Sequence, residues 1–275
     1  MQQAVVADNL ARSSPWLGER SFRGWRDEFD QQGYLVFEKV LSVDELSSLR
    51  AALAPYLDQN LKGRNNFEGE HTNRIYALLA KSPVFAELAI HPLALAFAEA
   101  DLGTTCLLSA CLAINLQPGE TVQPWHFDDG SIGVKRPRPS FGVSAFWAID
   151  ETTALNGATQ IIPESHLWGP QALGDQGDRD DAIAVALPAG SLMLTKGTLW
   201  HRGGANRSAD PRLIITPQYC PGWARPLETM LLAVPPNIAD TLPKRARELL
   251  GYSILPPFMG YVDGMHPRRV LPGEG

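Results

Sequence analysis

The hydrophobic pattern of the chain changes near Gly103, from helical spacing before that residue to short apolar runs after it. In the first part, residues 42–57 predict a helix because their apolar positions repeat at intervals of three and four. Ser42 and Glu45 have the spacing of a capping box, which marks the start of a helix. The positions that share the apolar face are Leu46, Leu49 and Leu53.

Three further segments complete the N-terminal part. Residues 34–40 predict a strand, and the polar residues 60–75 predict a loop. Residues 82–103 predict one or two short helices that break before Pro92, because the residue before a proline is pushed out of the helical region. We therefore expect a helical region at about residues 20–103.

After Gly103, short apolar runs alternate with turns that contain Gly and Pro. This pattern is typical of a sandwich, barrel or jelly roll, and it predicts a β core at about residues 104–220. Residues 238–252 then predict a helix within a helical and irregular cap at about residues 221–275. We interpret the whole chain, 1–275, as one domain, since single all-β domains often reach about 250 residues. The predicted strands are 106–116, 121–127, 141–149, 158–163, 183–195, 198–201 and 212–219.

The composition is that of an ordinary globular protein, with 44% hydrophobic and 20% charged residues. The formal net charge of −6 argues against non-specific binding to nucleic acid, which depends on neutralising phosphates. We therefore expect a small molecule as the partner, no nucleic acid, and a monomer or a small homo-oligomer.

Three cysteines without any CxxC motif argue against both a disulfide framework and a zinc knuckle. Free thiols indicate a reducing compartment, so we expect a cytoplasmic protein. The N-terminus has no basic region followed by an apolar run, and no uninterrupted apolar stretch approaches about 18 residues. We therefore expect neither a signal peptide nor a membrane span. The cysteines are Cys106, Cys111 and Cys220.

The segment QPWHFDDGS, residues 123–131, is the first candidate site. A histidine followed two positions later by a carboxylate suits a metal ion, because residues i and i+2 of a strand project to the same face. On that geometry His126 and Asp128 meet one ion, whereas Asp129 points away and begins a turn. With six histidines and 30 acidic residues in the chain, the motif also arises readily by chance, and an ordinary polar strand end is the alternative.

Three other features each have an ordinary structural interpretation when they are considered singly. His201 ends an apolar run before a Gly-Gly turn, as a capped strand end would. Arg212 opens the apolar strand 212–219, where a charged residue is usually a solvated rim residue. The segment NGATQIIPESH, residues 156–166, begins with an Asn-Gly turn signal. On strand 212–219, alternation puts four residues on one face: Arg212, Ile214, Thr216 and Gln218.

Together these features closely resemble the phytanoyl-CoA dioxygenase family of iron(II)- and 2-oxoglutarate-dependent oxygenases. That family carries His-x-Asp, an NGA…PxSH segment, a distal histidine, and an arginine eleven residues after that histidine. The matching elements are the stretch from His126 to Asp128, residues 156–166, His201, Arg212 and the tail 260–267. The resemblance covers about residues 30–268. One departure is PESH where family members commonly have PGSH, which concerns a loop conformation and not the chemistry.

The resemblance implies a double-stranded β-helix core, that is, a cupin-like jelly roll, with flanking helices. It implies that iron(II) binds to His126, Asp128 and His201, which leave the remaining coordination positions open. It also implies that 2-oxoglutarate chelates the iron and pairs through its distal carboxylate with Arg212, whose guanidinium fork suits a carboxylate. With O2 as the third cofactor, decarboxylation of 2-oxoglutarate to succinate and CO2 would drive hydroxylation of a small organic molecule.

Two more contacts to 2-oxoglutarate follow from family position. Thr159 would donate its hydroxyl to one carboxylate, and Gln123 would contact the other end. Gln123 has an odd offset from His126 and so falls on the opposite strand face, unless Pro124 marks a bulge. His166 is the rival for the second metal ligand, and its alternative role is a hydrogen bond that fixes a loop.

Two alternatives keep the fold but change the outcome. The same cofactors support desaturation, epoxidation or ring-forming oxidation in secondary metabolism, or the chain is a metal-binding jelly roll without turnover. The joint presence of the three metal ligands and Arg212 argues against the second alternative. A basic loop, with Lys135, Arg136 and Arg138, either favours an anionic substrate or is solvated, and Arg74 either reaches the pocket or lies on the surface.

The remaining aromatic and histidine residues carry no pattern of their own. We expect a place in the core for Trp125, Tyr76, Trp147 and Phe258, and a platform for the substrate is the alternative. We expect structural roles for His71, His91 and His266.

Overall fold

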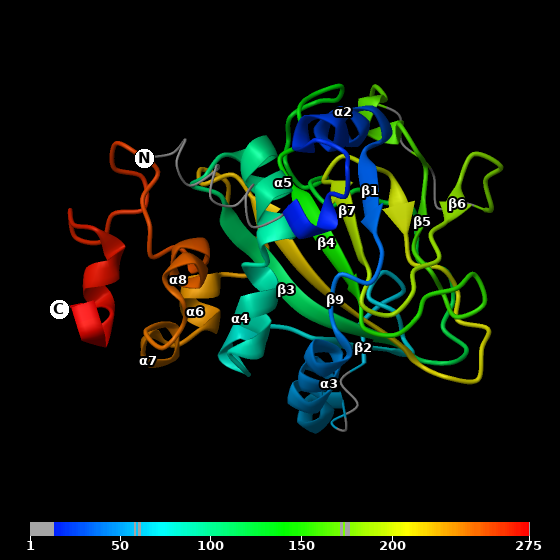
Figure 1. Ribbon diagram of the computed structural model, residues 1–275, viewed down its shortest axis with the longest axis horizontal. Helices are drawn as coiled ribbons and strands as arrows, with labels where there is room; N and C mark the ends of the chain where they lie inside the picture. Colours follow the sequence, from blue (N-terminus) through cyan, green and yellow to red (C-terminus); the bar gives the residue numbers. More distant parts are fainter. Residues whose placement is uncertain (1–13, 58, 60–61, 171–172, 174–176, 275) are drawn as a thin grey trace.

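The computed structural model describes residues 14–57, 59, 62–170, 173 and 177–274. The strands form two antiparallel sheets, one of six strands and one of three (Figure 1). The large sheet has the order β1-β7-β4-β9-β3-β2, and the small sheet has the order β6-β5-β8. The strands are β1 Tyr34–Phe37, β2 Thr72–Ile75, β3 Leu107–Leu116, β4 Val143–Ala148, β5 Gln160–Ile161, β6 Ile183–Ala184, β7 Leu192–Lys196, β8 His201–Arg202 and β9 Arg212–Cys220.

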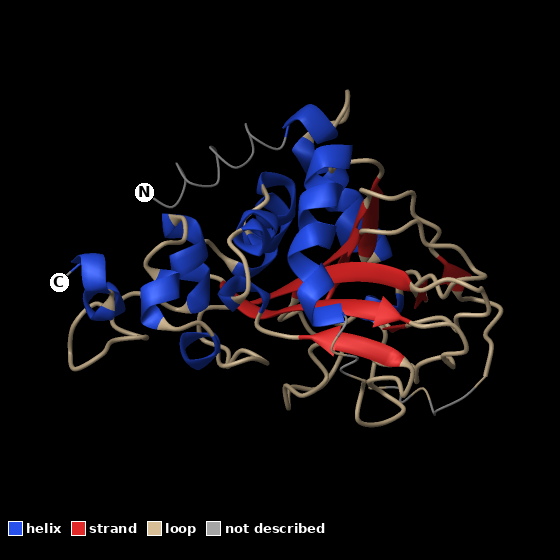
Figure 2. Ribbon diagram, turned by 90° about the horizontal axis from the view of Figure 1, so that it is seen from below, coloured by secondary structure: helices blue, strands red, loops and turns tan. Residues whose placement is uncertain are grey.

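Figure 2 shows most of the helices gathered on one side of the strands, with the loops around the other side. The segment that follows α8 extends away from both sheets (Figure 1). The helices are α2 Phe22–Gln32, α3 Val43–Leu57, α4 Val84–Ala89, α5 Pro92–Leu102, α6 Met230–Ala233, α7 Pro236–Ala239 and α8 Lys244–Leu250. Short 3-10 helices occupy Ser14–Trp16, Leu78–Ala80, Ser165–Leu167, Pro267–Val270 and Pro272–Glu274. Within the described parts of the chain, no helix is long and apolar enough to cross a bilayer.

The central strands of the large sheet send alternate side chains to two different environments, as strand geometry requires. One set joins the main core beneath the helices: Cys111 and Ala113 of β3, Val143, Ala145 and Trp147 of β4, and Leu213, Ile215 and Tyr219 of β9. The other set faces the small sheet, where Phe146, Ala148 and Ile214 belong to a second cluster. Burying one large apolar side chain stabilises a fold by about 1.5–3 kcal/mol. The main core, which holds most of the buried apolar side chains, therefore supplies most of the apolar stabilisation.

The predicted N-terminal elements are mostly confirmed. The capping box is present, because the Glu45 carboxylate accepts from the Ser42 backbone N–H at 2.7 Å and Ser42 Oγ accepts from the Glu45 N–H at 3.3 Å. Residues 82–103 form α4 and α5, with the break before Pro92. The predicted strand 34–40 is shorter and ends at Phe37. The predicted loop 60–75 is wrong at its end, because Thr72–Ile75 pairs with β3 as the edge strand β2.

The strand predictions are less accurate where polar and turn residues interrupt the runs. The segment 121–127 is not a strand, because its only ladder contact is an isolated bridge at His126. The run 183–195 is divided into β6 and β7, and the run 198–201 yields only β8. The predicted helix 238–252 is shortened to α8, which begins after Pro243.

Of the four aromatic residues expected in the core, Trp147 and Trp125 are buried. Tyr76 and Phe258 are exposed, by 38% and 64%, so the prediction is wrong for both. His91 and His266 are structural, because the side chain of each caps the N-terminus of a helix. Glu164, at the position where PGSH has glycine, adopts a left-handed backbone with φ 61°. The loop conformation that glycine would favour is therefore retained with glutamate.

Candidate metal centre and cosubstrate pocket

A cavity of about 360 Å³ lies against the face of the large sheet that does not contact the helices. Its wall follows from strand pairing, because residues paired across neighbouring antiparallel strands share a face: Thr216 of β9 pairs with Leu112 of β3, and Ile214 with Ile114. The predicted face of strand 212–219 is confirmed, since all four of its residues line this cavity. The residues of β3, β4 and β9 that line it are Ala110, Leu112, Ile114, Leu116, Phe146, Arg212, Ile214, Thr216 and Gln218, and the shorter strands β2 and β8 add Thr72, Arg74 and His201.

At one end of the cavity, His126 and His201 lie directly opposite each other in an antiparallel bridge. The two residues exchange both backbone hydrogen bonds, at 3.0 Å from the His126 N–H and 2.9 Å from the His201 N–H. Residues paired in this way project to the same side, and the two imidazole rings are 4.4 Å apart between centroids. The bridge therefore brings together two histidines that are 75 positions apart in the sequence.

The orientation of both imidazoles is fixed by the backbone. Nδ1 of His126 lies 3.0 Å from the Pro124 carbonyl, and Nδ1 of His201 lies 3.0 Å from the Leu199 carbonyl. A carbonyl can only accept, so the ring proton sits on Nδ1 and the lone pair of Nε2 is free to bind a metal. Burial, and then the nearby His201, lower the pKa of His126 to about 4, which keeps this ring neutral at physiological pH.

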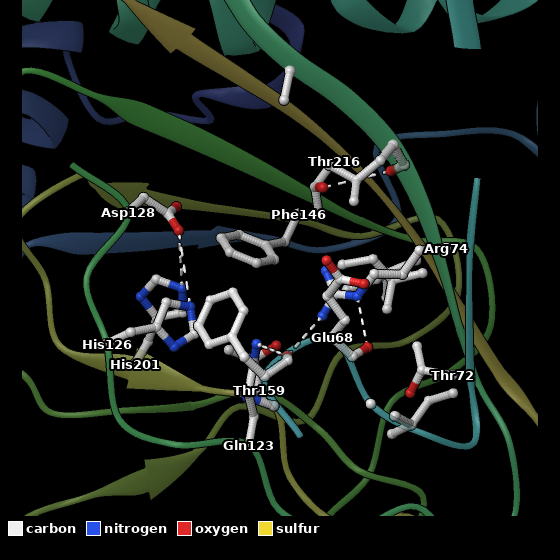
Figure 3. A pocket seen from close by; sticks show the side chains of 18 of the residues that line it. Glu68, Thr72, Arg74, Gln123, His126, Asp128, Phe146, Thr159, His201 and Thr216 are labelled. Carbon is white, nitrogen blue, oxygen red and sulfur yellow. Dashed lines mark hydrogen bonds and ion pairs between the residues drawn. The ribbon is translucent and has the colours of Figure 1, made fainter. Parts of the chain in front are cut away.

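Asp128 completes the group. Its Oδ1 lies 3.9 Å from Nε2 of His126 and 3.6 Å from Nε2 of His201, and the three ligand atoms are all within 4.8 Å of one another. Figure 3 shows the three side chains pointing toward one another at the end of the cavity. The other oxygen, Oδ2, accepts a hydrogen bond from the Ser144 hydroxyl. Two imidazoles and one carboxylate oxygen that face a common point are the donor set of a non-haem iron(II) site.

The expected choice of Asp128 over Asp129 therefore agrees with the geometry, but the reason given from the sequence does not. The argument required a strand that continues through Asp128, whereas residues 128–130 form a turn. Asp129 points away because its carboxylate pairs with Arg138, at 2.8 and 2.9 Å. His166 lies outside the group of potential ligands, and its Nε2 donates to the Asp30 carbonyl at 2.9 Å. Its expected role in fixing a loop is confirmed.

Arg212 reaches the same cavity from the first position of β9 and is only 2% exposed. One terminal nitrogen donates to the Gly157 carbonyl, whereas Nε and the other terminal nitrogen have no hydrogen-bond partner. Burial lowers the pKa of Arg212 to about 10, so the guanidinium remains charged at neutral pH. Among the described residues, no carboxylate forms an ion pair with Arg212. A buried cation with two open donors fits the distal carboxylate of a dicarboxylic acid.

Thr159 and Gln123 also line the cavity. Because residues 121–125 are not a strand, the parity problem of Gln123 does not arise, and no bulge at Pro124 is needed. The Gln123 amide is engaged at both ends, donating to the Phe67 carbonyl at 2.8 Å and accepting from the Gly203 N–H at 3.0 Å. In this arrangement Gln123 fixes the loop that carries Phe67.

Arg74 reaches the cavity from β2, so its alternative placement on the surface is wrong. Its guanidinium donates to the backbone carbonyls of Glu68 and Phe67, at 2.7 and 3.3 Å (Figure 3). The Phe67 ring packs edge-on against His126, 4.8 Å away between ring centroids.

Neither Phe67 nor Ser144 was predicted from the sequence. Ser144 had a usable signal, because it is the one polar residue inside the apolar strand Val143–Ala148.

Comparisons with known proteins support the same family. The model of the phytanoyl-CoA dioxygenase (PhyH) family matches residues 29–214. The dioxygenase trt7 of Aspergillus terreus is 26% identical over 81% of this chain and 81% of its own length. The dioxygenase FUM3 of Gibberella moniliformis is 27% identical over 82% of this chain and 80% of its own length.

A solved structure is also similar. The non-haem α-ketoglutarate-dependent carbocyclase SnoK from nogalamycin biosynthesis superposes with a TM-score of 0.58 and 21% identity, over 74% of this chain and 85% of that chain. This likeness confirms the jelly-roll fold. Because the family model covers more than half of the sequence, the chain belongs to the phytanoyl-CoA dioxygenase family. The enzyme class and the expected cofactors, iron(II), 2-oxoglutarate and O2, are thereby confirmed.

Proposed function

We propose that this member of the family hydroxylates a small organic molecule, with iron(II) held by His126, Asp128 and His201 and with 2-oxoglutarate paired to Arg212. One observation carries the proposal. The metal-binding group and the buried, partly unpaired guanidinium lie in the same cavity. A dicarboxylate that chelates a metal at one end requires a cation at its other end, and Arg212 is charged, buried and open on that side.

Iron(II), when bound, supplies the chemistry that couples O2 and the decarboxylation of 2-oxoglutarate to oxidation of the substrate. The residues of the chain have distinct tasks around it. The two imidazoles direct Nε2 toward the metal, since their Nδ1 atoms are held by backbone carbonyls. Asp128 offers one oxygen to the metal while Ser144 holds the other. Arg212 orients the cosubstrate and compensates its distal charge.

The rest of the cavity supports a small, largely apolar substrate. The whole cavity, which also includes the metal-binding group and Arg212, has a volume of about 360 Å³, within the range of roughly 300–1,000 Å³ that is typical of small-molecule sites. The carboxylate of Glu228 accepts two backbone N–H groups, at 2.9 and 3.0 Å, and that of Glu120 accepts two, at 2.7 and 2.9 Å. Arg74 is engaged with carbonyl groups. The charged groups that line this part of the cavity are therefore bonded within the protein, which leaves Gln218 and apolar side chains to meet the substrate.

Two further expectations remain part of the proposal. Residues from Leu17 to Leu271 contribute to one main core, which supports a single domain.

All three cysteines are buried and free, and burial raises the pKa of Cys106 to about 12 and that of Cys220 to about 11. Free thiols of low reactivity support the proposal that the protein works in the reducing cytoplasm.

The test is consumption of 2-oxoglutarate by the purified protein. Protein loaded with iron(II) without oxygen is exposed to air with 2-oxoglutarate, and succinate is measured with and without a panel of small molecules. We expect slow succinate release that needs iron(II), and faster release with a true substrate, whose product gains one oxygen atom. A product that lacks two hydrogens or has a new ring would replace hydroxylation with another oxidative outcome. Equal succinate in wild type and His201→Ala, with or without iron(II), would contradict the proposal.

A further inference from the structure

Two of the three cationic side chains in the basic loop that follows the turn at residues 128–130 are buried. Lys135 is exposed, but Arg136 is only 7% exposed and the Arg138 side chain is only 4% exposed. Neither Arg136 nor Arg138 lines the cavity at the metal centre. Buried arginines are rare unless they are paired, so the contacts of these two residues indicate what the loop does.

Arg138 forms a bidentate ion pair with Asp129, the aspartate next to the metal ligand. Its two terminal nitrogens lie 2.8 and 2.9 Å from the two carboxylate oxygens, and the Asp129 side chain is 4% exposed. The backbone N–H of Phe141 donates to the same carboxylate at 2.8 Å. Both oxygens of Asp129 are thus occupied, and neither is available to a metal. Arg138 also donates to the Asp129 carbonyl at 3.1 Å, so it holds the backbone as well as the side chain.

Arg136 holds the same region through aromatic rings. Its guanidinium lies over the ring of Phe127 at 4.7 Å and near the ring of Trp200 at 5.8 Å. One nitrogen donates to the Ser165 carbonyl, and the nitrogens that lack a hydrogen-bond partner belong to the group stacked on these rings. Phe127 stands between two of the metal ligands in the sequence, and Trp200 precedes the third.

The turn that carries Asp128 needs such support because it has little regular structure of its own. Its ladder contact ends at His126, and the next backbone link is the Asp129 N–H to the Gly197 carbonyl at 3.0 Å. A free carboxylate at position 129 would also compete with Asp128 for the ion. Groups that orient metal ligands from behind typically change metal affinity by about 10- to 100-fold when they are removed.

We propose that the Asp129–Arg138 ion pair is the positioning device of the metal centre: it fixes the turn so that Asp128 faces the two histidines, and it keeps Asp129 from binding the ion. Arg136 assists by clamping Phe127 against Trp200. The inference rests on the proposed metal site, but it makes no use of 2-oxoglutarate or of any substrate. It also gives the adjacent aspartates two separate tasks, one as a ligand and one as an anchor.

The experiment measures binding of cobalt(II) alone, by its visible absorption, to metal-free protein. The test variants are Asp129→Asn, which removes the charge, and Arg138→Lys, which keeps the charge but loses the fork. Controls come from another ion pair, Arg245 with Glu99 at 2.9 Å, whose side chains are 19% and 1% exposed and whose residues do not line the cavity. Glu99→Gln and Arg245→Lys remove a pair of the same kind without touching the turn.

We expect cobalt(II) affinity to fall about 10- to 100-fold in Asp129→Asn and less in Arg138→Lys, with a changed absorption spectrum because the ligand geometry changes. Both controls should lower the melting temperature yet bind cobalt(II) within about twofold of wild type. Unchanged affinity and spectrum in both test variants would overturn the inference. So would loss of folded protein in both test variants while the controls fold, because the pair would then serve stability alone. Failure of wild type to bind cobalt(II) would instead contradict the proposed function.

Discussion

The two sides of the cavity are built in different ways. On one side, β9 runs as a regular strand between β3 and β4, and its alternate residues from Arg212 to Gln218 all face the cavity. On the other side, residues 121–130 touch a ladder only at His126, and hydrogen bonds and ion pairs hold the rest. The wall is therefore positioned by its own periodicity, whereas the metal-binding turn is positioned by residues outside it, such as Arg138 and Gly197.

This difference predicts where the site should tolerate substitutions. A residue on the wall can be altered without moving its neighbours, because the ladder hydrogen bonds belong to the backbone. A residue on the turn is one of several contacts that fix the same short segment, so changes there spread to the ligands. The wall should therefore govern binding of the cosubstrate, and the turn should govern binding of the metal.

The largest effect is expected from removing a histidine ligand. His126→Ala or His201→Ala should reduce succinate release to the background level, because two ligands do not hold iron(II) in place. The fold should remain, since neither histidine belongs to the main core. Succinate assays, metal analysis and circular dichroism check both points. Loss of soluble protein in both variants would show that the metal region supports the fold, and the division between wall and turn would fail.

Variants of Arg212 test whether the β9 side of the cavity governs binding of 2-oxoglutarate. Arg212→Ala leaves the distal carboxylate of 2-oxoglutarate without a partner in a buried site, which typically costs about 2–5 kcal/mol, or roughly 30- to several-thousand-fold in affinity. Arg212→Lys should fall between, because it keeps the charge but loses the fork. Calorimetric titration of 2-oxoglutarate into the manganese(II) form gives these affinities. Cobalt(II) affinity should change by less than a few-fold, and a large loss there would mean that Arg212 also supports the metal.

How much of the site could be predicted follows the same division. Alternation along 212–219 predicted the cavity face correctly, because a strand between two neighbours has a fixed period. The same reasoning for 123–128 assumed a strand that is not there. The basic loop at 135–138 could not be interpreted from the sequence, since burial of Arg136 and Arg138 depends on partners that only folding brings near.

A smaller effect should separate Thr159 from its neighbours on the wall. Thr159→Val removes a hydroxyl that would donate to a carboxylate of 2-oxoglutarate, at a cost of about 1 kcal/mol, or roughly fivefold in the Michaelis constant. Thr216→Val is the control, because the Thr216 hydroxyl donates to the Leu112 carbonyl at 3.4 Å. An equal shift for both variants would indicate a general change of cavity polarity instead of a specific contact.

The smallest effect concerns Glu164, in the loop near the turn. Its left-handed backbone, with φ 61°, costs a non-glycine residue about 1–2 kcal/mol. Replacement by glycine would remove that cost. It would add an opposing cost of about 0.5–1 kcal/mol, because glycine loses more conformational freedom on folding. Glu164→Gly should therefore leave the free energy of unfolding unchanged or raise it by up to about 1.5 kcal/mol, as measured by urea unfolding. A loss of more than about 1 kcal/mol would show that the Glu164 side chain stabilises the loop, beyond its 3.3 Å hydrogen bond from Gln32.

The most direct test of the account is an anaerobic titration of 2-oxoglutarate into the iron(II) protein, followed by visible absorption. Chelation of iron(II) by the keto acid produces a charge-transfer band, so the band reports both ligands in one site. We expect a saturable band in wild type, a band in Arg212→Ala only at much higher 2-oxoglutarate, and none in His201→Ala. A wild-type protein without the band, or a band of equal affinity in all three proteins, would contradict the assignment of this cavity to iron(II) and 2-oxoglutarate.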